Sequence, residues 1–490
     1  MIKIFNKIWL IVALLINGAA IIIIEILGTR IIAPYFGTTL YVWTALIVIT
    51  LLALALGYFF GGKLADKKPD WKIFYSLFLI ASLLFILIPL VDGWILNLTG
   101  SLGIMWGPLV AALLLFFLVL GVQGMITPFA VRLNVDEIKW TGRTVGSIYA
   151  ISTVGSIIGA VIVAYLLIPN FGISTILIST AVILFLISAI WFLANKSGSG
   201  TVISALLIGA ALVLIQPSTQ ADANVLETTQ SFYGNITVEK LSTDLTCLSV
   251  NNIPQSCYNA NLDGSAFYYP DLMVRGLEQI DNPKKVLVIG DGSGLISREI
   301  LKKYQDIQID AVDIDEKIFD LGKQYLHFKD SSQVNKIVAD GRQFLRDSAG
   351  GYDAILIDAY TDSSPVLHLY TKEMFELAKM KMTDQGVLVV NSFGFSREQG
   401  SEAIKSLAKT LALVFNSNYI TSSGQASGET RGYFNFVHYA GQRELKKIGL
   451  AFEFETSDGA EMISDSFNPL EYMSLPASAE LINLYVTEDI

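Results

Sequence analysis

Charged residues are scarce in this chain: they make up 16% of its 490 residues, whereas 52% are hydrophobic. Soluble proteins average about 25% charged residues. The mean hydropathy of +0.52 also argues against an ordinary soluble composition. Cysteine and histidine are scarce too, with two and three residues, and we predict no metal site. The composition therefore predicts a membrane protein.

Basic residues are in the minority beyond Pro217. Residues 1–217 contain eleven Lys or Arg and six Asp or Glu, a net charge of +5, so the rest of the chain carries a net charge of −15. Nucleic-acid phosphates attract basic surfaces, so the acidic second half argues against a nucleic-acid partner and suits cationic substrates such as amines. We expect two unlike parts in one chain.

Long apolar runs fill the first half. A helix needs about 20 residues to cross about 30 Å of hydrocarbon. Seven runs are candidates, the last of them short: residues 8–24, 40–60, 73–90, 104–125, 145–168, 173–193 and 202–215. The first run is followed by further runs and lacks a small-residue cleavage site, so we do not expect a cleaved signal peptide. We predict a multi-pass helical domain over residues 1–217 in the cell (inner) membrane.

The composition changes after Pro217, where the small polar residues S-T-Q-A-D-A-N form a linker. Over residues 225–266 the apolar residues come in short runs typical of β-strands, and Asn251-Asn252 between two runs is a hairpin signal. We predict a linker and a small antiparallel sheet over residues 218–282.

Beyond Pro283, apolar strands alternate with amphipathic helices, which is the pattern of a parallel sheet with crossover helices. The expected strands cover residues 286–289, 309–312, 336–339, 354–357 and 387–390. We predict a Rossmann-like, methyltransferase-type α/β fold over residues 283–490.

The first expected strand runs into Gly290-Asp291-Gly292-Ser293-Gly294, and a helix follows. Glycines permit a tight turn and let backbone N–H groups approach a ligand closely. A lone Gly-x-Gly-x-Gly pattern is weakly specific, but the strand before it and the helix after it favour a nucleoside-binding loop. We therefore expect Gly290, Asp291 and Gly292 to bind a nucleoside.

Acidic residues end the next three expected strands. Asp313 lies 23 residues beyond Gly290, where Rossmann-like sites place an acid that accepts hydrogen bonds from ribose. Asp340 ends the third strand and Asp358 the fourth. Any one of them could instead cap a helix, and for Asp340 that alternative stays open. Because the carboxyl ends of parallel strands meet at one edge, the set indicates a ligand site there.

Four segments, in this order and spacing, resemble the polyamine aminopropyltransferase (spermidine synthase) family over roughly residues 225–390. They are V-L-V-I-G-D-G-S-G-L-I-S-R-E from Val286, A-V-D-I-D-E from Ala311, V-A-D-G-R-Q-F-L from Val338, and Y-D-A-I-L-I-D-A-Y-T-D-S-S-P-V-L-H-L-Y-T from Tyr352. Together they are more specific than any one of them.

The resemblance implies a role for each matching residue. Asp313 would hold the ribose, Asp340-Gly341 would contact adenine, and Asp358 would accept the proton. Pro365 matches the family proline that lines the adenine site. Tyr268-Tyr269 falls near the aromatic pair that contacts the amine.

Several positions depart from the family pattern. Ser293 stands where the family has the acid that grips the transferred aminopropyl amine, and Gly234 stands where a glutamine helps to bind the nucleoside. The second acid of the amine site is displaced from Thr361 to Asp362. The expected amine-binding residues are accordingly Tyr268, Tyr269, Ser293 and Asp362.

Two segments of the first half resemble the membrane region of aminopropyltransferase-like proteins fused to a major-facilitator-like bundle. They are E-I-L-G-T-R-I-I-A-P-Y-F-G from Glu25 and G-Y-F-F-G-G-K-L-A-D from Gly57. Seven spans would make about half of a normal transporter, so the resemblance does not indicate transport strongly.

The resemblance implies transfer of an aminopropyl group from decarboxylated S-adenosylmethionine to putrescine or a related amine, giving spermidine and methylthioadenosine. The sulfonium nucleoside would be a co-substrate, with no permanently bound cofactor. Two alternatives stay open: a methyltransferase-like enzyme that uses S-adenosylmethionine, and a non-enzymatic nucleoside or polyamine sensor or transporter. The expected partners are the amine, the nucleoside and the lipid bilayer, and a homo-oligomer is compatible with the sequence.

The loops around residues 63–72 and 132–143 are basic, as is the N-terminus, which the positive-inside rule places in the cytoplasm. Seven spans would then put the second half on the opposite side. Cys247 and Cys257 are equally spaced from Asn252 at the expected hairpin turn, so they either oppose each other in a disulfide or lie there by chance. The cytosolic supply of the substrates argues for the cytoplasmic side instead.

Overall fold

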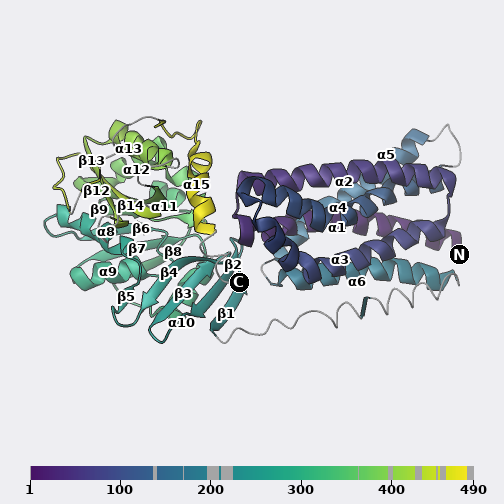
Figure 1. The fold of residues 1–490 in the computed structure, drawn as a ribbon, viewed down its shortest axis with the longest axis horizontal. Helices are drawn as coiled ribbons and strands as arrows, with labels where there is room; N and C mark the ends of the chain where they lie inside the picture. The colour runs from purple at the N-terminus through teal and green to yellow at the C-terminus, as the bar shows by residue number, and fades with distance from the viewer. Residues whose placement is uncertain are drawn as a thin grey trace. The chain divides into compact units, whose positions relative to one another are not determined.

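A computed structural model gives the structure of the chain. It describes residues 2–135, 141–168, 170–195, 209–210, 224–361, 364–395, 401–424, 433–448, 451–452 and 459–482. The chain divides into two compact units, Met1–Gln220 and Ala221–Ile490, both drawn in Figure 1.

The first unit is helical. Its helices are α1 (Ile2–Phe36), α2 (Leu40–Lys67), α3 (Trp71–Gly100), α4 (Gly103–Asn134), α5 (Thr141–Ile162), continued by a π-helical turn at Val163–Leu167, and α6 (Ile173–Ala194). Within the described residues, six helices are long and apolar enough to cross a membrane. The first six predicted runs fall on them, whereas the run at 202–215 lies outside the described residues except for 209–210.

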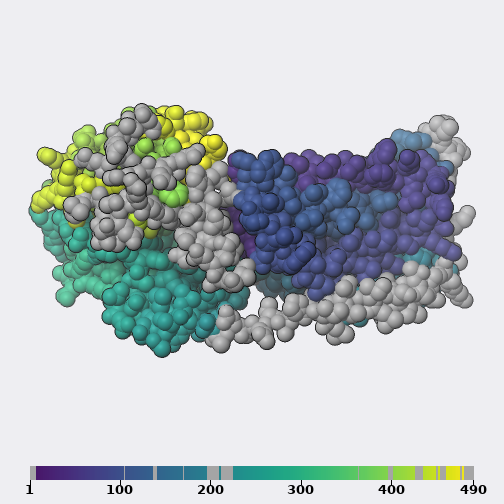
Figure 2. All heavy atoms as spheres, viewed as in Figure 1, coloured from purple at the N-terminus to yellow at the C-terminus, as the bar shows by residue number. Residues whose placement is uncertain are grey.

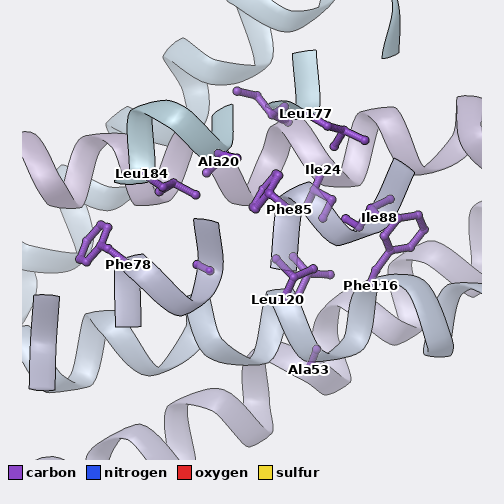
Figure 3. Close-up of a cluster of buried hydrophobic side chains, with 14 of the residues drawn as sticks. Ala20, Ile24, Ala53, Phe78, Phe85, Ile88, Phe116, Leu120, Leu177 and Leu184 are labelled. Carbon is purple, nitrogen blue, oxygen red and sulfur yellow. The ribbon is translucent and has the colours of Figure 1, made fainter. Parts of the chain in front are cut away.

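Large side chains and close glycine contacts hold these helices together. Phe78, Phe85 and Phe116 lie in the buried core shown in Figure 3 and are at most 2% exposed. A Cβ on Gly57 of α2 would lie 2.3 Å from the carbonyl oxygen of Gly121 on α4. Glycine therefore permits the backbones to approach, as is common between apolar helices. Figure 2 shows the helices closely packed on the face in view.

The second unit begins with a small antiparallel sheet of order β1-β2-β3-β4-β5. Its strands are β1 (Val225–Gln230), β2 (Asn235–Lys240), β3 (Leu245–Val250), β4 (Ile253–Asn259) and β5 (Gly264–Ser265). Asn251 and Asn252 join β3 to β4 with φ of 49° and 66°, a left-handed pair typical of a two-residue hairpin turn. The predicted hairpin is confirmed, and its Cys247 and Cys257 are cross-strand partners joined by a disulfide.

The larger sheet has seven strands in the order β13-β14-β12-β9-β6-β7-β8. They are β6 (Lys285–Ile289), β7 (Gln308–Asp313), β8 (Val334–Val338), β9 (Tyr352–Ile357), β12 (Met382–Phe395), β13 (Ser417–Ser422) and β14 (Tyr433–Gly441). The five predicted strands are the parallel ones. The sheet is mixed rather than purely parallel, because β14 runs antiparallel to both β12 and β13. The predicted methyltransferase-type α/β fold is confirmed with this correction.

Helices cover both faces of this sheet (Figure 1). They are α8 (Tyr269–Arg275), α9 (Leu295–Lys303), α10 (Glu316–Tyr325), α11 (Gly341–Asp347), α12 (Lys372–Lys381), α13 (Glu402–Val414) and α15 (Leu470–Ile482). The strands β6 and β9 are apolar beyond Lys285 and Asp353, because alternate residues face two cores: Leu287 packs with α11–α13, and Val288 with α8–α10. The sheet is thereby fixed from both sides, and its carboxyl edge holds the site.

Candidate active site

A cavity of about 460 Å³ lies at the carboxyl edge of the larger sheet. The strand ends contribute Asp313, Asp340, Asp358 and the loop Gly290–Ser293, and the β3–β4 hairpin of the small sheet forms a wall with Gln255 and Ser256. The four predicted strand ends therefore meet, as the parallel topology requires.

Two glycines in the loop after β6 are needed for its shape. Gly290 has φ of 92°, and a Cβ there would lie 2.0 Å from the carbonyl oxygen of Asp358. Gly294 has φ of 75°, and a Cβ there would overlap the ring of Phe328. The loop can thus cross the ends of β6 and β9 at close range only with glycine at these positions.

Asp291, one of the predicted nucleoside-binding residues, lies against the start of α9. Its carboxylate is 1% exposed and accepts hydrogen bonds from the backbone N–H of Ile296 and of Ser297, each at 3.1 Å, and from the Ser297 hydroxyl. Burial raises the pKa of Asp291 to about 7, although these hydrogen bonds oppose the shift. Asp291 borders the cavity, and its carboxylate accepts N–H groups of the first turn of α9. Its contact with a nucleoside stays a prediction.

Asp313 lies at the end of β7 beside the glycine loop. Its two oxygens accept hydrogen bonds from the backbone N–H of Gly292 and of Asp315, each at 2.9 Å. A Cβ on Gly292 would lie 2.6 Å from the Asp313 carboxylate, so glycine is required for this contact. Burial raises the pKa of Asp313 to about 6. The carboxylate keeps lone pairs that can accept ribose hydroxyls.

Asp340 caps a helix and also borders the cavity. Its Oδ1 accepts the backbone N–H of Gln343 at 2.9 Å and caps α11, while its Oδ2 lies 2.6 Å from Nε2 of His368. Burial raises the pKa of Asp340, but the hydrogen bonds from Gln343 and His368 outweigh it and hold the pKa below its ordinary value. A Cβ on Gly341 would lie 2.3 Å from Ile289, so glycine closes this corner of the cavity.

Asp358 lies at the end of β9, between the glycine loop and β12. Its Oδ1 accepts a hydrogen bond from Nδ2 of Asn391 at 2.8 Å, and the Tyr269 hydroxyl is a second partner. Nδ2 of Asn435 in turn donates to Oδ1 of Asn391 at 3.3 Å. Burial raises the pKa of Asp358 to about 6, and the Asn391 and Tyr269 hydrogen bonds limit the rise.

Asn391 and Asn435 were not predicted as site residues. Asn391 directly follows the predicted strand 387–390, so the rule applied to the first four strands would have found it. Asn435 could not be found that way, because it lies in β14, which runs antiparallel to β12.

Two other predicted residues, Tyr268 and Pro365, are absent from the described lining of the cavity, and a third, Asp362, is not described. Tyr268 is 46% exposed and does not line the cavity, because it precedes the first turn of α8 and faces solvent. Pro365 pairs with Tyr360 in a short hairpin of β10 (Tyr360–Thr361) and β11 (Ser364–Pro365), and its neighbour Val366 lines the cavity instead. Asp362 lies outside the described residues.

Ser293 forms a hydrogen bond with the small sheet at the cavity wall. Its hydroxyl lies 2.8 Å from the hydroxyl of Ser256 in β4, and Ser293 is 7% exposed. With the Asp291 carboxylate directed at α9, the described part of the glycine loop presents hydroxyl and backbone groups here, without a carboxylate.

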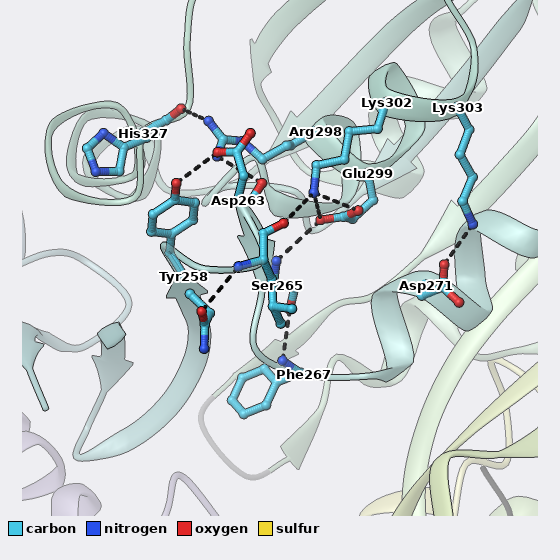
Figure 4. Close-up of polar contacts among 12 residues, drawn as sticks. Tyr258, Asp263, Ser265, Phe267, Asp271, Arg298, Glu299, Lys302, Lys303 and His327 are labelled. Carbon is cyan, nitrogen blue, oxygen red and sulfur yellow. Dashed lines mark hydrogen bonds and ion pairs between the residues drawn. The ribbon is translucent and has the colours of Figure 1, made fainter. Parts of the chain in front are cut away.

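A polar cluster fixes the β4–β5 hairpin to α9 (Figure 4). Arg298 of α9 pairs with Asp263 at 2.8 Å, and Tyr258 donates to the same carboxylate at 2.9 Å. The guanidinium also lies 5.0 Å from the centre of the Tyr258 ring and donates to the carbonyl of His327. Since Ser256 belongs to the same strand as Tyr258, the cluster helps to hold the cavity wall against the glycine loop.

Within the described ranges, no group of three or more His, Cys, Asp or Glu side chains is arranged to hold a metal ion. The cavity itself is bordered by five carboxylates and no Lys, Arg or His among the described residues. The carboxylates are Asp291, Asp313, Asp315, Asp340 and Asp358. Such a lining favours a cationic ligand.

A known protein family matches the part of the sequence that forms most of the cavity. Residues 266–423 match the family model of the "Spermine/spermidine synthase domain". This segment runs from the end of the small sheet through β13 and contains the glycine loop and all three predicted strand-end acids, so the match supports the family resemblance for this segment. The fusion to a major-facilitator-like region stays a prediction.

Two proteins with sequences similar to this chain are named polyamine aminopropyltransferases. The chain is 30% identical over 239 residues to the "Probable polyamine aminopropyl transferase" of Bifidobacterium longum, covering 48% of this chain and 52% of that protein. It is 27% identical over 233 residues to the "Polyamine aminopropyltransferase" of Vibrio vulnificus, covering 46% and 76%. The chain thus spans about half the length of the first relative. The solved spermidine synthase of Thermotoga maritima aligns with a TM-score of 0.38 at 18% identity, over 54% of this chain and 88% of that one.

Proposed function

We propose that the second unit transfers an aminopropyl group from decarboxylated S-adenosylmethionine to an amine, putrescine or a related one, and releases methylthioadenosine. The observation that carries the proposal is the position of Asp358. This buried carboxylate borders the same cavity as the glycine loop and Asp313, and it is held by hydrogen bonds from Asn391 and Tyr269. The matched family domain and the aminopropyltransferase relatives support the same reaction.

In this reaction the acceptor must first lose a proton, because an alkylammonium of pKa about 10 has no free electron pair. We assign the proton to Asp358. The amine nitrogen then attacks the carbon beside the sulfonium, the carbon–sulfur bond breaks, and its electron pair returns to sulfur as the neutral thioether. The raised pKa of Asp358, about 6, narrows the gap to the amine and makes the transfer easier than for an ordinary carboxylate.

The other acids would bind the donor. Asp313 would accept the ribose hydroxyls, and Asp340-Gly341 would border the adenine, while the backbone of Gly290 and Gly292 lets the nucleoside approach the sheet edge. Tyr269 would orient Asp358, since burial and the negative charge of Asp358 raise its pKa well above the ordinary value and keep its hydroxyl protonated.

A second candidate is methyl transfer from S-adenosylmethionine, favoured by one observation. The Ser293–Ser256 hydroxyl pair stands where the resemblance expects the acid that selects the decarboxylated donor. A neutral pair repels a donor carboxylate less than an aspartate would. The two reactions leave different products, methylthioadenosine and S-adenosylhomocysteine.

The deciding experiment incubates the purified full-length protein with each donor and a panel of amines and identifies the products by mass spectrometry. We expect methylthioadenosine and an aminopropylated amine. Asp358→Asn should abolish turnover and leave nucleoside binding nearly intact, because the amide has the same shape but cannot take up the proton. Near-normal turnover by this variant would remove Asp358 from the mechanism, and S-adenosylhomocysteine as the only nucleoside product would replace the proposal by methyl transfer.

We also propose that the helical unit lies in the cell (inner) membrane. Its six long helices expose large apolar side chains, among them Phe59 at 61%, Leu118 at 63% and Tyr165 at 76%, and exposed apolar surface on this scale suits lipid rather than water. Recovery of the protein in the membrane fraction after alkaline washing is the expected result, and release into the wash would contradict it.

A further inference from the structure

Two short segments that lie apart in the sequence line the same part of the cavity. Asp340 borders it at the start of α11, and Val366 and Leu369 border it from the loop that leads to α12. The two segments touch through His368, whose Nε2 lies 2.6 Å from Oδ2 of Asp340. Residues 366–371, the base loop, therefore form a wall beside the acid that would border the adenine.

Residues 463–468, the clamp segment, hold the base loop in place from a distant part of the sequence. The backbone N–H of Lys372, just beyond the loop, donates to the carbonyl of Ile463 at 2.9 Å. Within the loop, the carbonyl of Leu367 accepts a hydrogen bond from Nδ2 of Asn468 at 2.9 Å. Because Ile463 is 0% exposed and belongs to a hydrophobic core of the sheet, the clamp segment is itself firmly anchored.

One side chain of the clamp segment, Asp465, joins the base loop to α11. Its two oxygens accept hydrogen bonds from Nη1 and Nη2 of Arg342 at 2.7 and 2.6 Å, and its Oδ1 also accepts the Thr371 hydroxyl at 2.8 Å. Nη1 of Arg342 also donates to the carbonyl of His368 at 3.2 Å. A bidentate guanidinium–carboxylate pair fixes direction as well as distance. Asp465 thereby fixes the position of Arg342 relative to the base loop.

The same contacts determine the surroundings of the Asp340 carboxylate. Arg342 follows Asp340 by two residues in α11, and it holds the carbonyl of His368, whose imidazole lies at Oδ2 of Asp340. The other oxygen of Asp340 accepts the backbone N–H of Gln343. A carboxylate oxygen has two lone pairs, so Oδ2 can accept an adenine amino group in addition to the His368 contact. Displacement of the base loop would therefore change the direction in which Oδ2 faces the base.

We propose that Asp465 is a positioning residue for recognition of the nucleoside base, and that it acts on Asp340 through Arg342 and the base loop. The inference rests on the proposed function, in which Asp340 borders the adenine. It extends the site to a segment outside residues 266–423, which match the family model. The Asp465 side chain is 43% exposed. Since exposed ion pairs contribute little to stability, loss of its charge should alter base recognition and leave the fold intact.

Asp465→Asn in the full-length protein tests this role with two nucleosides, methylthioadenosine and methylthioinosine. The inosine base has a carbonyl in place of the amino group that would donate to Asp340, so we expect the wild type to bind methylthioadenosine more tightly. In calorimetry, Asp465→Asn should weaken methylthioadenosine binding about tenfold and methylthioinosine binding less than about threefold, because only the first uses the hydrogen bond to the carboxylate. An unchanged affinity ratio, or a wild type that does not distinguish the nucleosides, would overturn the inference.

Two further variants separate positioning from folding. Glu461→Gln removes an exposed carboxylate a few residues earlier and should leave both affinities and the melting temperature as in the wild type. Arg342→Lys keeps the positive charge but cannot form the bidentate contact, so it should lower the affinity ratio as Asp465→Asn does. If Asp465→Asn fails to fold, the ratio in Arg342→Lys decides, and a wild-type ratio there would overturn the inference.

A double variant shows whether the two residues act as one unit. Asp465→Asn combined with Arg342→Lys should reduce the affinity ratio little more than either change alone, because each single change already breaks the same contact. Additive losses would mean that the two side chains act independently, and they would overturn the inference.

Turnover separates this inference from the proposed reaction. With decarboxylated S-adenosylmethionine and putrescine, Asp465→Asn should raise KM for the donor about tenfold and change kcat less than about twofold, because the hydrogen bonds of Asp358 come from Asn391 and Tyr269. A wild type that forms no aminopropylated amine, but loses base discrimination in Asp465→Asn, would refute the proposed function and uphold the inference. Aminopropyl transfer with a wild-type donor KM and affinity ratio in Asp465→Asn would do the reverse.

Discussion

Ser293→Asp tests whether the Ser293–Ser256 contact sets the choice of donor. In the structure the Ser293 hydroxyl lies 2.8 Å from the Ser256 hydroxyl. The Asp291 carboxylate accepts hydrogen bonds from backbone N–H groups at the start of α9. An aspartate at position 293 would place a carboxylate beside Ser256, whereas the carboxylate of Asp291 in the same loop is directed at α9. The ammonium of the decarboxylated donor would gain a charged partner there, and the carboxylate of S-adenosylmethionine would be repelled.

The change in donor preference depends on three contributions: a new hydrogen bond to a charged group, the lost serine pair, and repulsion between carboxylates. A hydrogen bond to a charged group contributes about 1.5–3 kcal/mol, and loss of the serine pair costs about 0.5–1.5 kcal/mol. Two carboxylates about 5 Å apart repel by roughly 3 kcal/mol at an effective dielectric constant of about 20. The hydrogen-bond loss affects both donors equally, and the other two contributions favour the decarboxylated donor by about 4.5–6 kcal/mol together. The donor ratio should therefore shift by about three to four orders of magnitude, since about 1.4 kcal/mol is a factor of ten.

The assay offers both donors in competition and measures methylthioadenosine and S-adenosylhomocysteine by mass spectrometry. Ser293→Asn is the matched control, because it has the shape of aspartate without the charge. We expect the donor ratio to shift toward the decarboxylated donor only in Ser293→Asp. An unchanged ratio in a variant with a wild-type melting temperature would refute the alignment of Ser293 with the family acid.

Three further predictions concern binding, pH and sidedness. Asp313→Ala should weaken methylthioadenosine binding by about 1–3 kcal/mol in calorimetry, because a buried hydrogen-bond acceptor is lost; unchanged affinity would place the ribose elsewhere. Because Asp358 must be ionised to act and its pKa is raised to about 6, kcat/KM should fall as the pH drops below about 6. Asn391→Leu removes a donor that lowers this pKa, so the acid limb should move to higher pH, and an unmoved limb would assign it to another group. Finally, Cys247 and Cys257 should label with an impermeant thiol reagent on intact cells only after reduction, and labelling that needs lysis would contradict the outward orientation.

The sequence predicts a strand or turn correctly where the residues of that segment alone determine its conformation. The starts of β6, β7, β8 and β9 are predicted within two residues because each strand contains a short apolar run that leads into a glycine or an acid. The antiparallel strand β14 is missed, because its direction is set by pairing with β12 and β13 and by no signal in its own residues. The hairpin at Asn251-Asn252 is predicted correctly because both residues tolerate the left-handed conformation that the turn requires.

The site is predicted less completely because side-chain direction depends on tertiary contacts. Asp313 and Asp358 border the cavity as strand position requires. Asp291 has the same chemistry, but the exposed N–H groups of α9 lie close enough to take its carboxylate. Tyr268 and Tyr269 are adjacent in sequence, yet the start of α8 directs one to solvent and the other to Asp358.

The β3–β4 hairpin forms one wall of the cavity but shares no strand pairing with the seven-stranded sheet. Its turn is made by two adjacent residues and its cross-link joins its own two strands, so its shape is encoded within about fifteen consecutive residues. Such a segment can be replaced as a unit without a change in the strand pairing of the larger sheet. Replacement of the hairpin would alter the cavity wall at Gln255 and Ser256 and leave the residues at the strand ends in place.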